Sequence, residues 1–158
     1  QTSDLFQKRV DMASKELVQY SNEDRTSVGI RINYAINSWQ VIKKNPIIGI
    51  GTGDFPTEYS KINKINSPKL PESDNPHNMY ILVLMQLGLV GLFSLLSIFY
   101  YQIKHSYNSS SKFIRDVGNT LPILFLVLMF SDSYLLGHFT TLVYVFFSAF
   151  LYKDFEKN

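Results

Sequence analysis

The feature that most constrains this chain is a run of about 23 residues, from Tyr80 to Gln102, without a charged side chain. At about 1.5 Å of rise per residue, a helix of this length covers about 34 Å, enough to cross a hydrocarbon core of about 30 Å. Residues 119–152 are also apolar, apart from a polar patch at residues 131–138. Lipid explains uncharged runs of this length better than the core of one small soluble domain does.

We therefore predict an all-α integral membrane protein with about three transmembrane helices and a large extracytoplasmic helical loop. The predicted parts are an outer loop at 1–78, a transmembrane helix at 79–103, a cytoplasmic loop at 104–116, two transmembrane helices within 117–152 and a cytoplasmic tail at 153–158. The short loop is placed inside because it carries an excess of positive charge, and such loops remain cytoplasmic.

Within the outer loop, apolar residues at helical spacing predict helices at residues 3–20 and 28–44, the second ending at Asn45-Pro46. Residues 56–76 contain several prolines and predict a long extramembrane loop. The last two spans, 117–131 and 135–152, are expected to turn at Asp132 on the outer side, with Pro122 in the first turn of its helix. Because the chain begins at Gln1 within polar sequence, we expect it to be the carboxyl-terminal part of a longer protein.

Composition excludes several function classes. The formal net charge is only +2, and the lysines of the first half alternate with acids, which does not suit nucleic-acid binding. The chain has no cysteine, so disulfides, zinc-thiolate sites and cysteine nucleophiles are excluded. We expect neither a metal nor a cofactor.

His77 is the first candidate for chemistry because it stands directly before the first predicted span. An imidazole is substantially neutral at physiological pH and can act as a general base, here toward a sugar hydroxyl beside a lipid-borne substrate. The alternative is that Pro76-His77-Asn78 merely caps the helix, with Asn78 accepting backbone amides. Both readings are compatible.

Arg31 is the second candidate, because a guanidinium stays charged and offers forked donors that match diphosphate oxygens. Arg25 is a further candidate cation in a polar break nearby. The alternative for Arg31 is a solvated surface arginine. Asp132 and His138 are interpreted as residues of the outer turn, since a surface turn removes the cost of burying charge in lipid.

Three alternating glycines, Gly49, Gly51 and Gly53, follow the second predicted helix. Glycine permits positive φ and close approach of another group, so this loop either folds around a substrate or makes a tight turn. It is not a nucleotide-binding loop, because the later glycine of the dinucleotide fingerprint and a Walker lysine are both missing.

Two segments together carry a family resemblance. They are RINYAINSWQVIKKNPIIGIGTGDF, at residues 31–55, and PHNMYILVLMQLGLVGLFSLL, at residues 76–96. An arginine opening a helix with a tryptophan, an NPxxGxGxxxF segment and an HNxYL-like motif before a GLxG span resemble the carboxyl-terminal half of the O-antigen ligase family, here with HNMYI as a mild departure. That family includes O-antigen polymerases and protein O-oligosaccharyltransferases.

The resemblance implies a metal-independent glycosyltransferase of the bacterial inner membrane that works on the periplasmic face. Its donor would be a polyprenyl diphosphate-linked glycan, and its acceptor lipid A-core or another glycan. His77 would be the base toward the acceptor hydroxyl and Arg31 the diphosphate ligand, with Arg25, Asn78, Gly49, Gly51 and Gly53 contacting substrate. Earlier helices would supply further basic residues, so this chain alone should be inactive. A polymerase, a protein oligosaccharyltransferase and a non-enzymatic transport or assembly subunit remain the alternatives.

Overall fold

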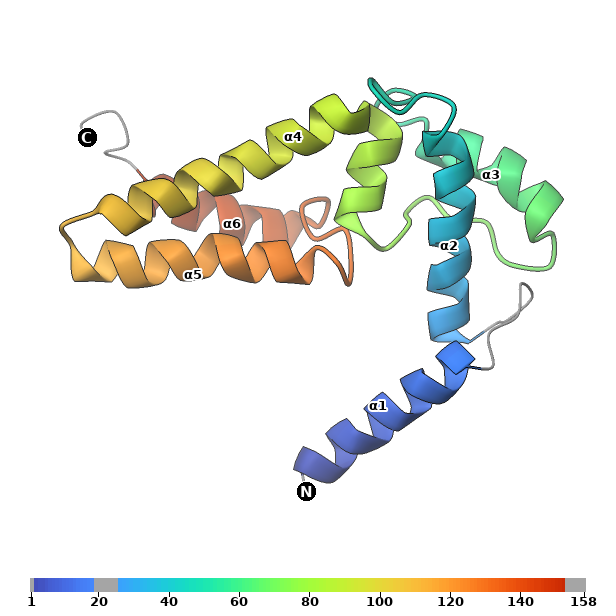
Figure 1. Ribbon diagram of the computed structural model, residues 1–158, viewed down its shortest axis with the longest axis horizontal. Helices are drawn as coiled ribbons and strands as arrows, with labels where there is room; N and C mark the ends of the chain where they lie inside the picture. Colours follow the sequence, from blue (N-terminus) through green and yellow to red (C-terminus); the bar gives the residue numbers. More distant parts are fainter. Residues whose placement is uncertain (1, 19–25, 153–158) are drawn as a thin grey trace.

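The computed structural model describes residues 2–18 and 26–152, and all regular structure in these ranges is helical (Figure 1). The helices are α1 (Thr2–Val18), α2 (Ser27–Ile42), α3 (Phe55–Asn66), α4 (Met79–Asn108), α5 (Lys112–Leu128) and α6 (His138–Leu151). The predicted all-α class is confirmed. Helices α2 and α3 pack on the first part of α4, whereas α5 packs along the rest of it and α6 packs mainly on α5 (Figure 1).

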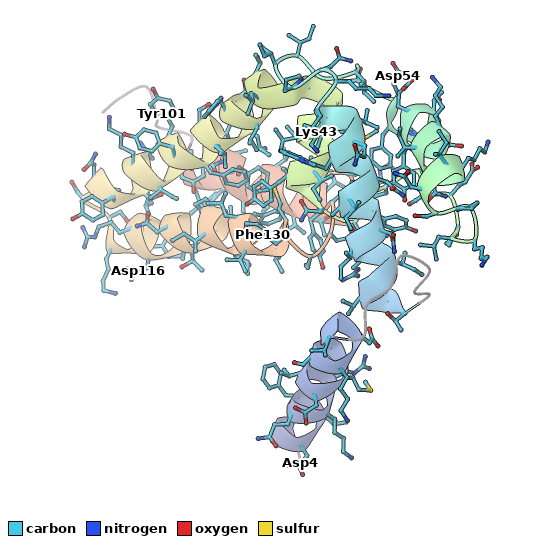
Figure 2. All side chains as sticks on the ribbon, turned by 45° about the vertical axis from the view of Figure 1, so that its right-hand side comes forward. Asp4, Lys43, Asp54, Tyr101, Asp116 and Phe130 are labelled. Atoms are coloured by element: carbon cyan, nitrogen blue, oxygen red, sulfur yellow. The ribbon has the colours of Figure 1, made fainter. Side chains whose placement is uncertain are left out.

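Helix α2 closely follows the prediction because its end signals are local. The hydroxyl of Thr26 accepts a hydrogen bond from the N–H of Gly29 at 3.1 Å and caps the first turn. The helix ends at Ile42, just before Asn45-Pro46. In Figure 2, Lys43 and Asp54 lie near the end of the α2–α3 pair where the chain passes from α2 to α3.

Helix α3 is a correction to the long loop predicted for residues 56–76. The segment predicted as the outer loop therefore contains three helices among its described residues rather than two. Proline is tolerated in the first turn, where its missing N–H costs least, and Pro56 occupies that turn. Phe55 and Tyr59, one turn apart, are both fully buried and stack with ring centroids 5.4 Å apart. The burial of Phe55 and Tyr59 stabilises the helix in a segment whose prolines predict a loop.

Helix α4 runs past the predicted end at residue 103 and is broken at Gly88, which has φ 63° and ψ −159°. This region of backbone conformation is essentially open to glycine alone. The break divides α4 into a short arm, residues 79–87, and a long arm, residues 89–108, which point in different directions (Figure 1). Gly88 thus replaces one straight span by an elbow.

The glycine loop at residues 45–51 satisfies the backbone groups that the elbow leaves open. Two of its amides donate to the short arm, Ile50 to Met85 at 3.0 Å and Gly51 to Gln86 at 2.9 Å, and two of its carbonyls accept from the long arm, Pro46 from Leu89 at 2.9 Å and Ile47 from Val90 at 3.2 Å. Backbone groups that are kept from water require such internal pairing.

The loop and the elbow approach each other this closely because both contain glycine. A Cβ atom on Gly49 would lie 2.4 Å from the backbone of Gln86, and one on Gly88 would lie 2.3 Å from the carbonyl oxygen of Ile47. Neither contact is possible for a larger residue. The tight packing of Gly49 thus has a structural cause, while its predicted contact with substrate stays a prediction.

Helices α4 and α5 form a hairpin with a much shorter connection than predicted. The loop expected at residues 104–116 is helical at both ends, since α4 continues to Asn108 and α5 begins at Lys112 after the cap residue Ser111. Pro122 consequently lies inside α5, not in its first turn as predicted. Phe99, Phe125 and Tyr144 join α4, α5 and α6 in the hydrophobic core.

By length and composition, α4 is long and apolar enough to cross a membrane, and α6 is a shorter apolar helix; this holds for the described residues. Large apolar side chains are exposed along the long arm and α6, such as Phe93, Phe139, Leu142 and Phe146. Such a surface suits contact with lipid. The division into three spans stays a prediction.

Candidate active site

The backbone at His77 adopts a conformation that non-glycine residues rarely use. With φ 51°, it is the only non-glycine residue with positive φ in the described part of the chain. Its N–H donates to Oδ1 of Asn75 at 3.0 Å, and the intervening Pro76 is fully buried. Such a conformation costs about 1–3 kcal/mol and is concentrated at functional sites. The surrounding loop therefore fixes where the imidazole points.

Asn78 caps α4 and at the same time attaches its start to the end of α5. Its Oδ1 accepts from the N–H of Ile81 at 3.0 Å, and its Nδ2 donates to the carbonyl of Phe130 at 3.0 Å. The N–H of Met79 donates to the carbonyl of Met129 at 3.0 Å. The capping alternative is confirmed, and it leaves the side chain of His77 available for other contacts.

Asp132 is the side chain that His77 meets. The Nδ1 atom of His77 lies 3.2 Å from Oδ1 of Asp132, and the two side chains are 39% and 40% exposed. The same carboxylate oxygen accepts the N–H of Ser133 at 2.7 Å, which orients it. From the sequence, Asp132 is predicted only to be a residue of the outer turn. The turn is present, but it also delivers the carboxylate to the imidazole.

A second bridge holds the two segments together. The hydroxyl of Ser133, itself buried, donates to Oδ1 of Asn75 at 2.7 Å, the atom that also receives the N–H of His77. Asn75 therefore links the backbone of His77 to the residue after Asp132. These hydrogen bonds fix the position and the orientation of His77 and Asp132 relative to each other.

Tyr34 forms the other wall beside His77. Its ring stacks on the imidazole with centroids 5.9 Å apart and an interplanar angle of 21°. Tyr34 is 6% exposed and meets Tyr59 edge to face at 5.6 Å. Through this stack, α2 reaches the start of α4.

Behind Tyr34 lies a buried polar layer between α2 and α3. Nδ2 of Asn37 lies within 3.3–3.5 Å of the side-chain oxygens of Asn63, Ser67 and Tyr59, and Ser67 donates to Asn33 at 3.3 Å. Desolvation by burial raises the pKa of Tyr59 to about 12 despite its hydrogen bond with Asn37. Tyr59 is therefore a neutral part of this layer, which locks α2 against α3.

Arg31 lies on α2, three residues before Tyr34, and its side chain is exposed. Residues three apart share a helix face, so Arg31 lies on the side of α2 that carries Tyr34 to His77. In the described residues it makes no ion pair. Arg25 lies outside the described residues.

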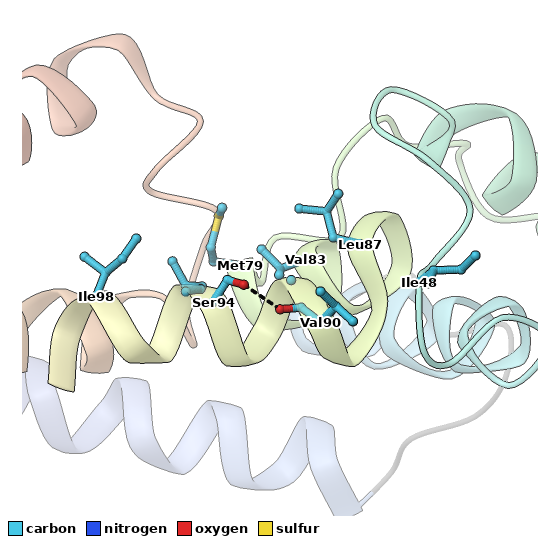
Figure 3. A pocket seen from close by; sticks show the side chains of 9 residues that line it. Ile48, Met79, Val83, Leu87, Val90, Ser94 and Ile98 are labelled. Carbon is cyan, nitrogen blue, oxygen red and sulfur yellow. Dashed lines mark hydrogen bonds between the residues drawn. The ribbon is translucent and has the colours of Figure 1, made fainter. Parts of the chain in front are cut away.

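An apolar groove of about 570 Å³ lies between the two arms of the elbow (Figure 3). Its walls come from both arms of α4 and from the glycine loop, and they include Met79, Val83, Leu87, Val90, Ile98 and Ile48. The hydroxyl of Ser94 is already bonded to the carbonyl of Val90 at 2.8 Å. The groove thus presents an apolar surface. Its lining residue Met79 follows His77 by two positions in the chain.

The arrangement suits proton transfer. An ionised Asp132 facing Nδ1 favours the tautomer with hydrogen on that nitrogen, which leaves the lone pair on Nε2 as the acceptor. The carboxylate would also stabilise the imidazolium that forms. Within the described ranges, no group of three or more His, Asp or Glu side chains could hold a metal ion.

Other histidines are not part of this site. His105 lies near the far end of α4, where its ring meets that of Tyr152 at 6.0 Å. His138 is the exposed first residue of α6. Of the described candidates, the structure brings together His77, Asn78 and, through Tyr34, the helix of Arg31.

A family model described as O-antigen ligase matches residues 3–96, more than half of the chain. The chain belongs to the O-antigen ligase family. No curated protein matches, and no solved structure matches. The family match confirms the resemblance found in the two sequence segments.

Members of the O-antigen ligase family are membrane-associated, glycosyltransferase-like enzymes that use a glycan-linked lipid carrier and an acceptor. The match includes Arg31, the glycine loop and His77, but it ends before Asp132. No sequence signal could have joined residues 77 and 132, since they come together only through the packing of α4 on α5.

Proposed function

We propose that this O-antigen ligase family member transfers a glycan from a polyprenyl diphosphate carrier to a lipid A-core acceptor. The reaction takes place on the periplasmic face of the bacterial inner membrane and needs no metal. The observation that carries the proposal is the contact between His77 and Asp132 at the start of α4. It provides a histidine base, oriented by a carboxylate, at the edge of an apolar helix.

In the proposed reaction, an acceptor hydroxyl attacks the anomeric carbon of the carrier-linked sugar. Nε2 of His77 takes the hydroxyl proton, the new glycosidic bond forms, and the bond to the diphosphate oxygen breaks with its electron pair. Asp132 stabilises the resulting imidazolium. Arg31 neutralises the charge that develops on the departing diphosphate.

The apolar groove suits the isoprenoid chain of the carrier. It offers no free polar group, so a hydrocarbon chain loses no hydrogen bond on entering it. Because Met79 lines the groove and follows His77 by two residues, a chain lying there keeps its diphosphate end near the imidazole. Arg25, Asn78 and the glycines Gly49, Gly51 and Gly53 remain proposed contacts to the substrate.

The proposed topology has three spans, built from the long arm of α4, α5 and α6. At the end of the α4–α5 hairpin remote from His77 lie the cations Lys104, Lys112 and Arg115. A positively charged short connection is expected on the cytoplasmic side. His77 and Asp132 then face the periplasm.

Complementation tests the proposal. The full-length gene carrying His77→Ala or Arg31→Ala is introduced into a strain that lacks its ligase, and glycan attached to lipid A-core is measured at matched protein levels. We expect His77→Ala to lower transfer by about 10²–10⁴-fold, the usual contribution of a general base. Arg9→Ala, a change of the same kind on α1, is the control and should restore attachment.

The outcomes separate the alternatives. Normal attachment by both variants would reject the assigned site, whereas failure of wild type itself to restore attachment would favour a non-enzymatic transport or assembly subunit. Longer glycan chains without attachment would favour a polymerase. Glycan recovered on protein would favour an oligosaccharyltransferase.

A further inference from the structure

A second cavity, of about 390 Å³, lies on the side of Asp132 that faces the start of α6. Residues of three segments line it: Asn75 before α4, Asp132 and Tyr134 after α5, and Leu136 and Thr140 around the start of α6. Its volume lies within the range of about 300–1,000 Å³ that is usual for small-molecule sites. We call it the turn pocket.

Two polar atoms on the lining have no hydrogen bond within the described part of the chain. Oδ1 of Asp132 already accepts from Ser133 and contacts His77, which leaves Oδ2 as an unused acceptor. Oδ1 of Asn75 accepts from His77 and from Ser133, which leaves the two donors of Nδ2 unused. The turn pocket therefore offers one strong acceptor and one amide donor.

These free atoms select the chemistry of the ligand. A sugar hydroxyl is both donor and acceptor, so neighbouring hydroxyls can satisfy a carboxylate and an amide together. A phosphate has acceptor oxygens only, and the lining contains a carboxylate but neither lysine nor arginine. The turn pocket thus favours a neutral polyhydroxyl group over the diphosphate of the carrier.

The remaining lining is amphipathic. Tyr134 adds an aromatic ring, whose face suits the C–H side of a sugar ring while its hydroxyl can bond to water or ligand. Leu136, which is 56% exposed, adds an apolar edge at the rim. A carboxylate, an amide and an aromatic ring around one cavity form a combination suited to a pyranose.

We infer that the turn pocket binds the sugar of the acceptor. Asp132 belongs both to the turn pocket and to the His77 pair, so a sugar with one hydroxyl bonded to Oδ2 would be held beside the imidazole, where another hydroxyl of the same sugar could give its proton to Nε2. The inference rests on the proposed function and deepens it, because a saccharide acceptor distinguishes a ligase or polymerase from an enzyme that glycosylates serine or threonine.

Steady-state kinetics of the full-length protein in membranes provide the test, with a saccharide acceptor varied at saturating carrier-linked glycan. Tyr134→Leu removes the ring and Leu136→Trp narrows the rim. For both, we expect the acceptor KM to rise about tenfold, the size of one lost contact, with kcat and the carrier KM within about twofold of wild type. Tyr107→Leu, at a tyrosine 76% exposed near the far end of α4, is the matched control.

Direct binding separates this inference from the proposed function. Saturation-transfer NMR of purified full-length protein with methyl glucoside should show contact that Leu136→Trp abolishes, even if no transfer occurs. If wild type transfers glycan but both variants keep the acceptor KM, the turn pocket is not the acceptor site and the inference fails alone. Competition by an acetyl-serine amide but not by methyl glucoside would likewise overturn it.

Discussion

Nδ1 of His77 lies 3.2 Å from Oδ1 of Asp132, although 55 positions separate the two residues in the sequence. The contact joins the residue before α4 to the turn after α5. It orients the imidazole of a loop histidine at the end of an apolar helix. Four predictions arise from this pair and from the structure that supports it.

Asp132→Asn should lower glycan transfer by about 10²-fold or more, because an amide can donate to Nδ1 and so favour the wrong imidazole tautomer. Protein level and thermal unfolding should change little, since the side chain is 40% exposed. Transfer by membranes carrying the variant is the measurement. Asp74→Asn, at an exposed residue near His77 in the chain, is the control, and equal activity of the two variants would remove Asp132 from the mechanism.

Tyr34→Ala should lower kcat by about tenfold or more with a smaller effect on the acceptor KM, because the imidazole loses the ring that fixes its plane. Tyr34→Phe retains the stack and should restore most of the activity. Steady-state kinetics of both variants check this. An equal loss for Phe and Ala would mean that the hydroxyl, not the ring, is what matters at this position.

Gly88→Ala should destabilise the protein by at least about 3 kcal/mol or prevent its accumulation, since it combines backbone strain with a clash. The added Cβ would lie 2.3 Å from the carbonyl oxygen of Ile47. Gly53→Ala is the matched control: its φ is also positive, at 89°, but a Cβ there meets nothing within 4 Å. Thermal unfolding in detergent should place Gly53→Ala well above Gly88→Ala, and the reverse order would refute the fit between the loop and the elbow.

Alkaline pH should destabilise the fold through Tyr59. Burial raises its pKa from 10.0 to about 12, so the unfolded chain releases this proton first, and stability present below pH 10 is lost as pH rises toward 12. The loss is at most about 2–3 kcal/mol. Unfolding temperatures between pH 9 and 12 should fall less for Tyr59→Phe than for wild type. Tyr107→Phe, at an exposed position, should follow the wild-type curve.

Much of the fold was predictable because its signals are local. The uncharged run after Tyr80 predicts a long apolar helix from length and composition alone, and α4 confirms it apart from the break at Gly88. The end of α2 before Asn45-Pro46 and the cap by Asn78 depend on residues within one turn. The family was accessible too, because its motifs are continuous segments within residues 3–96.

The site itself depended on contacts that no local pattern contains. Helix α3, with Pro56 in its first turn, forms because Phe55 and Tyr59 are fully buried. The elbow at Gly88 exists because the glycine loop bonds to both of its sides. His77 was recognisable as a candidate from the sequence, but its carboxylate partner was not. Side-chain type and spacing are properties of the chain, whereas the meeting of residues 77 and 132 is decided by how α4 and α5 pack, which sums many distant contacts.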